Sequence, residues 1–110
     1  MTKVKLSKTQ RGFATGSFTD RYGKKCSIQK SSIATEDCIW LGIDDAEPQI
    51  MSSDAIRMGL KERTGTEADW GWTPFFIPPE VSLDTRMHLS QEQVKELLPI
   101  LQKFVETGEI

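Results

Sequence analysis

The sequence predicts an α+β fold: an antiparallel sheet of four or five short strands, with a C-terminal amphipathic helix packed on one face. Three observations lead to this prediction. Residues 12–31 show the two-residue alternation of a β-hairpin, residues 38–43 form a short apolar run, and residues 90–107 repeat apolar side chains at helical spacing. Since 110 residues match one ordinary domain, we expect residues 11–110 to form a single α+β domain.

The N-terminal segment is polar and shows no periodicity, so we predict that residues 1–10 form a flexible basic arm. Beyond it, Phe13 and Phe18 lie in an alternating pattern that ends at the turn residues 20–23. Cys26 and Ile28 then alternate with polar residues. This pattern is typical of strands with one buried and one exposed face, and it predicts a hairpin over residues 12–31.

The run from Cys38 to Ile43 is nearly continuous in apolar residues and rich in β-branched and aromatic types, which favours a central strand over a helix. Two cysteines, Cys26 and Cys38, are too few for a disulfide scaffold. If their strands form a hairpin that turns near Ser32, the two would lie opposite each other, close enough to bridge. In a reducing cytosol we expect free, buried thiols instead.

A short helix is indicated from the capping residues Ser53 and Asp54 to Arg63, because Ile56 and Leu60 lie one turn apart; Gly59 weakens this assignment. The following segment, residues 70–79, holds four of the nine aromatic side chains, and its three prolines exclude a regular helix. These aromatics either pack inward or form a recognition surface. Because two tryptophans flanking one glycine are difficult to bury in a small monomer, we expect a homo-oligomer.

Residues 83–89 have an extended character and lead into the clearest element of the chain. Ser90 and Gln93 have the spacing of a capping box, and Gly108 supplies a stop signal. Between them the apolar residues recur on one side of a helix, which predicts that this side belongs to the core. They are Val94, Leu97, Leu98, Leu101, Phe104 and Val105.

The charge is unevenly distributed along the chain. Residues 1–33 carry about +7 and the remainder about −9, although the whole chain has a net charge of −2. Eight basic residues produce the positive charge: Lys3, Lys5, Lys8, Arg11, Arg21, Lys24, Lys25 and Lys30. A basic surface of this kind attracts anions, whereas the acidic remainder argues against a general nucleic-acid binder.

Several segments resemble a family of small uncharacterised proteins encoded by tailed bacteriophages and prophages. The segments are residues 18–23, 26–32, 39–42 and 85–90, followed by Val94, Leu97, Leu98 and Gly108, and residues 44–80 are not covered. This resemblance implies a bacterial cytoplasm during infection and a role among accessory proteins that bind or block a target. It supplies no functional residues.

We therefore expect a non-enzymatic accessory protein that sequesters an anionic, nucleotide-like ligand. In this hypothesis Arg11, Lys25 and Arg86 hold the anion, Trp72 stacks the base, and His88 completes the ligand-binding set. Each residue has an ordinary structural alternative: a solvated lysine, an arginine paired with a carboxylate, a packed histidine or a core tryptophan. The charge pattern alone does not separate these alternatives.

Two other functions remain open. A protein-interaction module would block a host protein through its acidic surface and aromatic loop. A phosphodiester hydrolase would use His88, the only histidine, together with His88 of a second subunit. The sequence contains no metal-ligand spacing, no phosphate loop and no dinucleotide fingerprint, so we predict no metal and no cofactor. No apolar run is long enough to span a membrane, and nothing indicates export, so cytoplasmic residence is expected.

Overall fold

The computed structural model describes residues 3–110 and divides into two compact units. The chain up to Asp44 together with Thr85–Ile110 forms the first, here called the sheet unit, and Asp45–Asp84 forms the second, the loop unit. The predicted α+β class is confirmed. Within the segment predicted to be a single domain, residues 11–110, the chain leaves the sheet unit at Asp44 and returns to it at Thr85.

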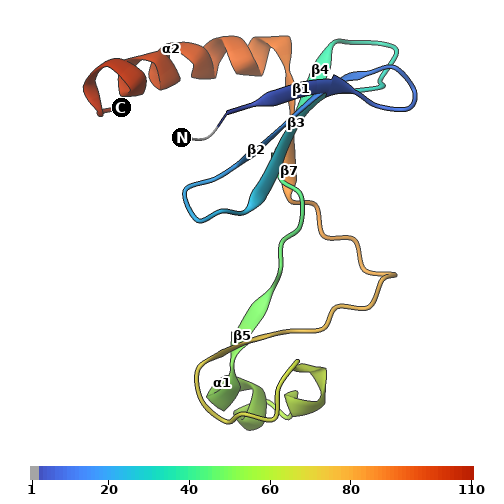
Figure 1. Cartoon of the computed structure of the whole chain (residues 1–110), viewed down its shortest axis with the longest axis vertical. Helices are drawn as coiled ribbons and strands as arrows, with labels where there is room; N and C mark the ends of the chain where they lie inside the picture. The colour runs from blue at the N-terminus through green and yellow to red at the C-terminus, as the bar shows by residue number, and fades with distance from the viewer. Residues whose placement is uncertain (1–2) are drawn as a thin grey trace. The chain divides into compact units, whose positions relative to one another are not determined.

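The sheet unit is built on a five-stranded antiparallel sheet in the order β1-β2-β3-β4-β7 (Figure 1). Its strands are β1 (Lys5–Lys8), β2 (Ala14–Thr19), β3 (Lys25–Lys30), β4 (Cys38–Ile43) and β7 (Arg86–Ser90). The predicted hairpin over residues 12–31 is confirmed as the β2–β3 pair. Strand β4 lies between β3 and β7, as predicted for a central strand.

Strand β1 occupies most of the segment predicted to be a flexible arm. Lys5–Lys8 pairs in register with Ala14–Ser17 of β2 and forms one edge of the sheet. The prediction was wrong here because polar residues on an exposed edge strand give no apolar alternation, and all four residues of β1 are exposed. Residues 1–2 of the predicted arm lie outside the described residues.

The strand register separates the sheet into two chemically different faces, since side chains alternate along each strand. One face, here called the polar face, carries mainly hydroxyl, amide and cationic side chains from all five strands. Its members are Lys5, Ser7, Thr15, Ser17, Thr19, Lys25, Ser27, Gln29, Trp40, Arg86 and His88, with Gly42 among them. The opposite, apolar face carries Leu6, Phe18, Cys26, Ile28, Ile39, Leu41, Ile43, Met87 and Leu89, with Ala14, Gly16 and two lysines, Lys8 and Lys30, at one end.

Both cysteines are free and buried, as predicted, with exposed fractions of 4% for Cys26 and 5% for Cys38. They do not lie opposite each other, because the β3–β4 register pairs Cys26 with Ile43 and the β4–β7 register pairs Cys38 with Ser90. The two thiols therefore belong to opposite ends of the sheet. Facing cysteines would need a turn near Ser32, whereas the pairing of Lys30 with Ile39 places the centre of the β3–β4 connection further along the chain.

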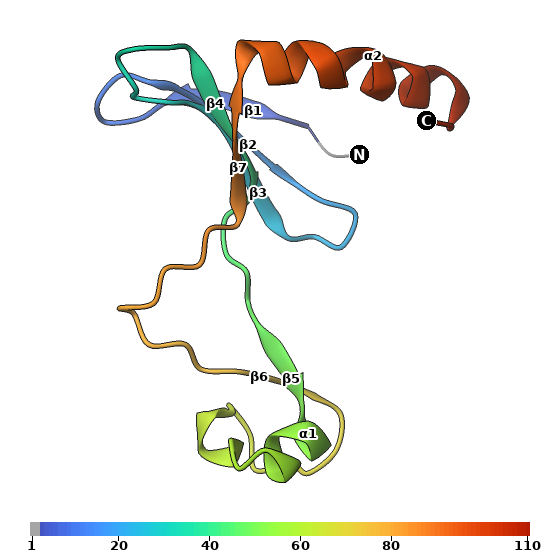
Figure 2. The same ribbon diagram turned by 180° about the vertical axis from the view of Figure 1, so that it is seen from behind.

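Helix α2 (Gln91–Thr107) begins directly at the end of β7, and both predicted caps are present. The Ser90 hydroxyl accepts a hydrogen bond from the Gln93 amide, the Gln93 side chain accepts one from the Ser90 amide, and Gly108 is left-handed at φ 77°. However, no residue of α2 is buried, so its apolar side is not the core element that the sequence predicted. Figure 2 shows α2 running across, rather than along, the direction of β7.

The loop unit contains little regular structure. A two-stranded antiparallel sheet joins β5 (Gln49–Met51) to β6 (Trp72–Pro74). The helix predicted from residue 53 to Arg63 is split into α1 (Ser52–Arg57) and a 3-10 turn, η1 (Lys61–Arg63). The split falls at Gly59, whose positive φ of 72° ends the α-helical conformation.

Candidate functional site

Three side chains from the two strands at one edge of the sheet form an aromatic and cationic cluster on the polar face. Trp40 of β4 lies directly opposite His88 of β7, and their rings stack with centroids 3.9 Å apart and planes inclined by 10°. The Arg86 guanidinium lies 5.6 Å from the centroid of the Trp40 ring. The cluster arises because Arg86 and His88 are two residues apart on β7 and so share a face.

His88 also contacts a buried hydroxyl group. Its Nε2 lies 3.0 Å from the Ser31 Oγ, and either atom can be the donor, depending on the histidine tautomer. Ser31 is only 3% exposed, and its hydroxyl accepts a further hydrogen bond from the Ile33 amide. A serine buried in this way is not accessible as a nucleophile, and the contact serves to fix the orientation of the imidazole ring.

Two lysines add positive charge to the same face. Lys5 of β1 pairs with Ser17 of β2, and Lys25 of β3 pairs with Thr19 of β2. Ser17 and Thr19 are two residues apart on β2 and so share a face. These four residues line an open hollow of about 570 Å³ together with Lys3 and Asp44. Among residues 3–110, no carboxylate forms an ion pair with Lys5, Lys25 or Arg86. The polar face thus carries these cations with Asp44 as the carboxylate that lines the same hollow.

Hydroxyl groups and a glycine occupy the space between these cations. One register row runs Lys5, Ser17, Ser27, Gly42 and Arg86, one residue from each strand. The Ser27 hydroxyl donates to the Asp44 carboxylate at 2.8 Å, which directs that carboxylate to a neutral partner. A Cβ at Gly42 would lie 2.6 Å from the Thr85 carbonyl oxygen. The glycine therefore permits the close approach of the segment that carries Arg86.

The structure brings together only part of the predicted ligand-binding set. Arg86 and His88 meet at Trp40, and Lys25 lies on the same face of the sheet. Arg11 lies in the β1–β2 turn, at the end of the sheet away from Lys25, and its guanidinium lies 5.4 Å from the Phe13 ring. Trp72 belongs to the loop unit, where its side chain is 68% exposed.

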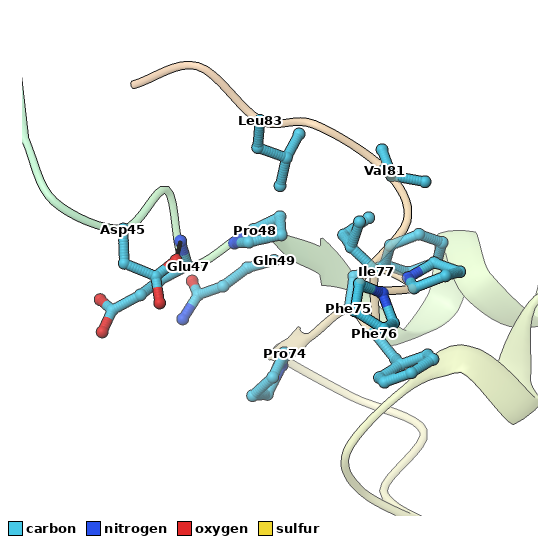
Figure 3. Close-up of a pocket in the computed structure, with 12 residues that line it drawn as sticks. Asp45, Glu47, Pro48, Gln49, Pro74, Phe75, Phe76, Ile77, Val81 and Leu83 are labelled. Carbon is cyan, nitrogen blue, oxygen red and sulfur yellow. Dashed lines mark hydrogen bonds between the residues drawn. The ribbon is translucent and has the colours of Figure 1, made fainter. Parts of the chain in front are cut away.

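The loop unit has a hollow of its own, with a volume of about 670 Å³ (Figure 3). Its wall is formed mainly by proline and aromatic side chains, with acidic residues toward one end: Asp45, Glu47, Pro48, Gln49, Pro74, Phe75, Phe76, Ile77, Pro78, Pro79, Val81 and Leu83. The Arg63 side chain supports this wall, because its guanidinium donates to the Phe76 carbonyl at 3.0 Å and lies over the Phe75 ring.

Sequence reasoning missed Trp40, Lys5 and Ser31 as members of the site. Trp40 was assigned to an apolar central strand and Lys5 to an arm, and only the strand register shows which face each residue occupies. The part of the chain that the structure describes contains no cluster of three or more His, Cys, Asp or Glu side chains suited to a metal ion. Over the same residues, no helix has the length and apolar character needed to cross a membrane.

Comparisons of this chain with protein-family models, with curated proteins and with solved structures gave no match.

Proposed function

We propose that this protein binds and sequesters an anionic, nucleotide-like ligand on the polar face of its sheet, without catalysing a reaction. The observation that carries this proposal is the combination on one face of the Trp40–His88 stack, the adjacent Arg86 guanidinium and the lysines Lys5 and Lys25. Aromatic rings bind a base through its π-face, and guanidinium and ammonium groups bind phosphate oxygens.

The spacing of the cations favours an extended ligand over a single phosphate group. Lys5 and Arg86 lie on the two outer strands of the sheet, four strand spacings or about 19 Å apart at the backbone. Lys25 lies on the middle strand. A ligand that carries two separated phosphates, such as a dinucleotide, would reach more than one of these cations, while a base extends the existing aromatic stack.

The proposed biological setting comes from the resemblance to bacteriophage and prophage proteins. We propose that the protein is an accessory component that acts in the bacterial cytoplasm and removes a signalling nucleotide from solution. Sequestration requires affinity and not turnover. The contacts of His88 support sequestration over catalysis. Its ring is held by the Ser31 hydroxyl and by the stack on Trp40.

Thermal-shift measurements with a panel of linear and cyclic mono- and dinucleotides test the proposal. A ligand present at about a hundred times its dissociation constant should stabilise the folded protein by about 2.7 kcal/mol. We expect dinucleotides to raise the melting temperature more than inorganic phosphate does. If no nucleotide changes the melting temperature or gives a calorimetric binding signal, the proposed function is wrong.

A matched pair of charge reversals locates the binding face. Lys5 and Lys8 are exposed residues of the same strand, but they lie on opposite faces of the sheet. Lys5→Glu and Arg86→Gln should each weaken nucleotide binding, whereas Lys8→Glu should have little effect. An equal loss in the Lys5 and Lys8 variants would indicate long-range electrostatic attraction and would contradict a site on the polar face.

A second candidate function, docking to a host protein, is favoured by the exposed aromatic side chains of the loop unit. Trp70, Trp72 and Phe76 are 78%, 68% and 63% exposed, and buried aromatic anchors dominate many protein interfaces. The acidic charge of the chain beyond residue 33 would suit a basic partner. If a purified partner bound wild-type protein and Lys5→Glu equally but did not bind Trp72→Ala, this function would replace nucleotide sequestration.

A further inference from the structure

The apolar face of the sheet is only partly covered within the sheet unit: Cys26 is buried and Ile28 and Leu41 are half-buried, whereas residues at the two edges are exposed. Leu6 is 81% exposed, Met87 53% and Val4, just before β1, 54%. Val4 and Leu6 gather with Ile28 over Gly16, since their side-chain atoms would lie 2.9 to 3.1 Å from a Cβ at that position. A sheet face that leaves large apolar side chains exposed at both of its edges is typical of a surface that another element or molecule covers.

Helix α2 also has an uncovered apolar side. Its large apolar side chains recur at helical spacing, and each is at least 39% exposed: Leu97, Leu98, Ile100, Leu101, Phe104 and Val105. Only Val94, in the second turn, is less exposed. Val94 and Leu98 line a hollow with Ile39 and Leu89 at the end of the sheet, so only the first turns of the helix approach the strands.

Helix α2 leaves β7 in a direction that brings only its first turns close to the sheet of its own chain. Ser90 is both the last residue of β7 and the N-cap of α2, so no linker separates strand from helix. The reciprocal capping bonds between Ser90 and Gln93 fix the first turn. Ser90 is also paired with Cys38 of β4, so the residue from which the helix departs is itself held in the sheet.

The exposed area agrees with a large surface that another molecule covers. The chain exposes 8985 Å², whereas two separate compact units with the lengths of the sheet and loop units would together expose about 7,300 Å². The difference of about 1,700 Å² per chain corresponds to about 3,400 Å² for a pair, within the roughly 2,000–5,000 Å² typical of obligate homodimers.

We propose that two copies of this chain form a symmetric dimer in which the apolar side of α2 from each copy lies across the apolar sheet face of the other. The dimensions match, because the 17 residues of α2 extend over about 25 Å and the five-stranded sheet is about 24 Å wide. The arrangement is reciprocal, as two-fold symmetry requires. The polar face remains free in this dimer, so dimerisation does not depend on the proposed ligand.

Light scattering coupled to gel filtration tests the dimer with two variants of adjacent residues. Leu101→Glu introduces a charge on the apolar side of α2, whereas Gln102→Glu introduces the same charge on the polar side. We expect wild type and Gln102→Glu to show twice the 12.4 kDa mass of the chain and Leu101→Glu to lose the dimer. A monomeric wild type at micromolar concentration would overturn the proposal.

A disulfide-trapping experiment identifies the contacting surfaces without depending on a disruptive variant. Ile28→Cys, on the middle strand of the apolar face, and Leu101→Cys, near the middle of α2, are prepared as separate proteins and then mixed under mild oxidation. The proposed dimer predicts a cross-link in the mixture and not in either protein alone. A cross-link in Leu101→Cys alone would show that the two helices pair with each other. If no sample forms a cross-link, the helix of one copy does not contact the sheet of the other. Either result contradicts the proposed arrangement.

Discussion

Trp40 and His88 stack across strands β4 and β7, with ring centroids 3.9 Å apart and planes inclined by 10°. This pair joins the interior strand β4 to β7, the edge strand that leads into helix α2. The stack therefore has a structural role as well as the ligand-binding role proposed for it. The two roles are separable, because the structural role is measured in the absence of any ligand.

A double-mutant cycle with Trp40→Leu and His88→Ala should give a coupling energy of about 0.5–1.5 kcal/mol, since stacked aromatic pairs contribute about this much beyond the area they bury. Urea unfolding of the four proteins provides the free energies. As a control, His88→Ala combined with Thr15→Ala should be additive within about 0.5 kcal/mol, because Thr15 lies three strands away from β7. Additivity in the Trp40 cycle would show that the stack contributes nothing to stability.

Gly42→Ala should destabilise the sheet and displace Arg86. A Cβ at this position would lie 2.6 Å from the Thr85 carbonyl oxygen and 2.8 Å from the Arg86 Cα, and these are backbone atoms that move only if β7 moves. We expect a loss of about 1–3 kcal/mol, as for other overpacked sites, together with weaker nucleotide binding.

The control for this variant is Ser27→Ala, which is in the same register row on the neighbouring strand but adds no atom to the interface between β4 and β7. It should lose only its hydrogen bond to Asp44. If Gly42→Ala unfolds at the same denaturant concentration as wild type, the close approach of Thr85 has no energetic importance.

Ser90→Ala removes the hydroxyl that accepts from the Gln93 amide, and loss of such a cap costs about 0.5–2 kcal/mol. We expect thermal melting followed by circular dichroism to show this loss. Gln91→Ala changes the next residue and leaves the capping box intact, so it should melt close to wild type. A smaller effect for Ser90→Ala than for Gln91→Ala would mean that the cap does not stabilise α2.

The elements that depend on local chemistry could be predicted from the sequence. Helix α2 begins and ends at the predicted signals, because Ser90 with Gln93 and Gly108 act within a few residues of chain. Strand β4 was predicted from its apolar run for the same reason. The edge strand β1 was missed, because an exposed polar strand is recognised only when its partner β2 is known.

The candidate site was only partly predictable because its residues meet through register. Arg86 and His88 were identified from their own chemistry, but Trp40 is brought to them by the β4–β7 pairing, which no local pattern specifies. The apolar side of α2 was assigned to the core of its own chain on the basis of its period. Period shows which side of a helix is apolar but not which surface covers it.

Cys26 and Cys38 should react slowly with thiol reagents in the folded protein. Burial raises the pKa of both thiols, and the nearby carboxylates of Asp20 and Asp44 raise the pKa of Cys26 further. Because the thiolate is the reactive form, both effects reduce the rate of modification. We expect fast labelling of both cysteines in denaturant and slow labelling in native buffer, whereas Ser17→Cys on the exposed part of the polar face should react quickly in both.

The same pKa shifts predict how the free energy of unfolding varies with pH. A raised pKa means that the folded state retains its thiol protons to a higher pH than the unfolded chain, whose cysteines ionise near the ordinary value of 9.0. This contribution is therefore complete below that value and is lost as the pH rises from it through the raised pKa of the folded state. Urea unfolding under reducing conditions should show a fall in stability above pH 9.0 that is smaller in a Cys26→Ala, Cys38→Ala double variant, and an identical fall in both proteins would exclude the thiols as its cause.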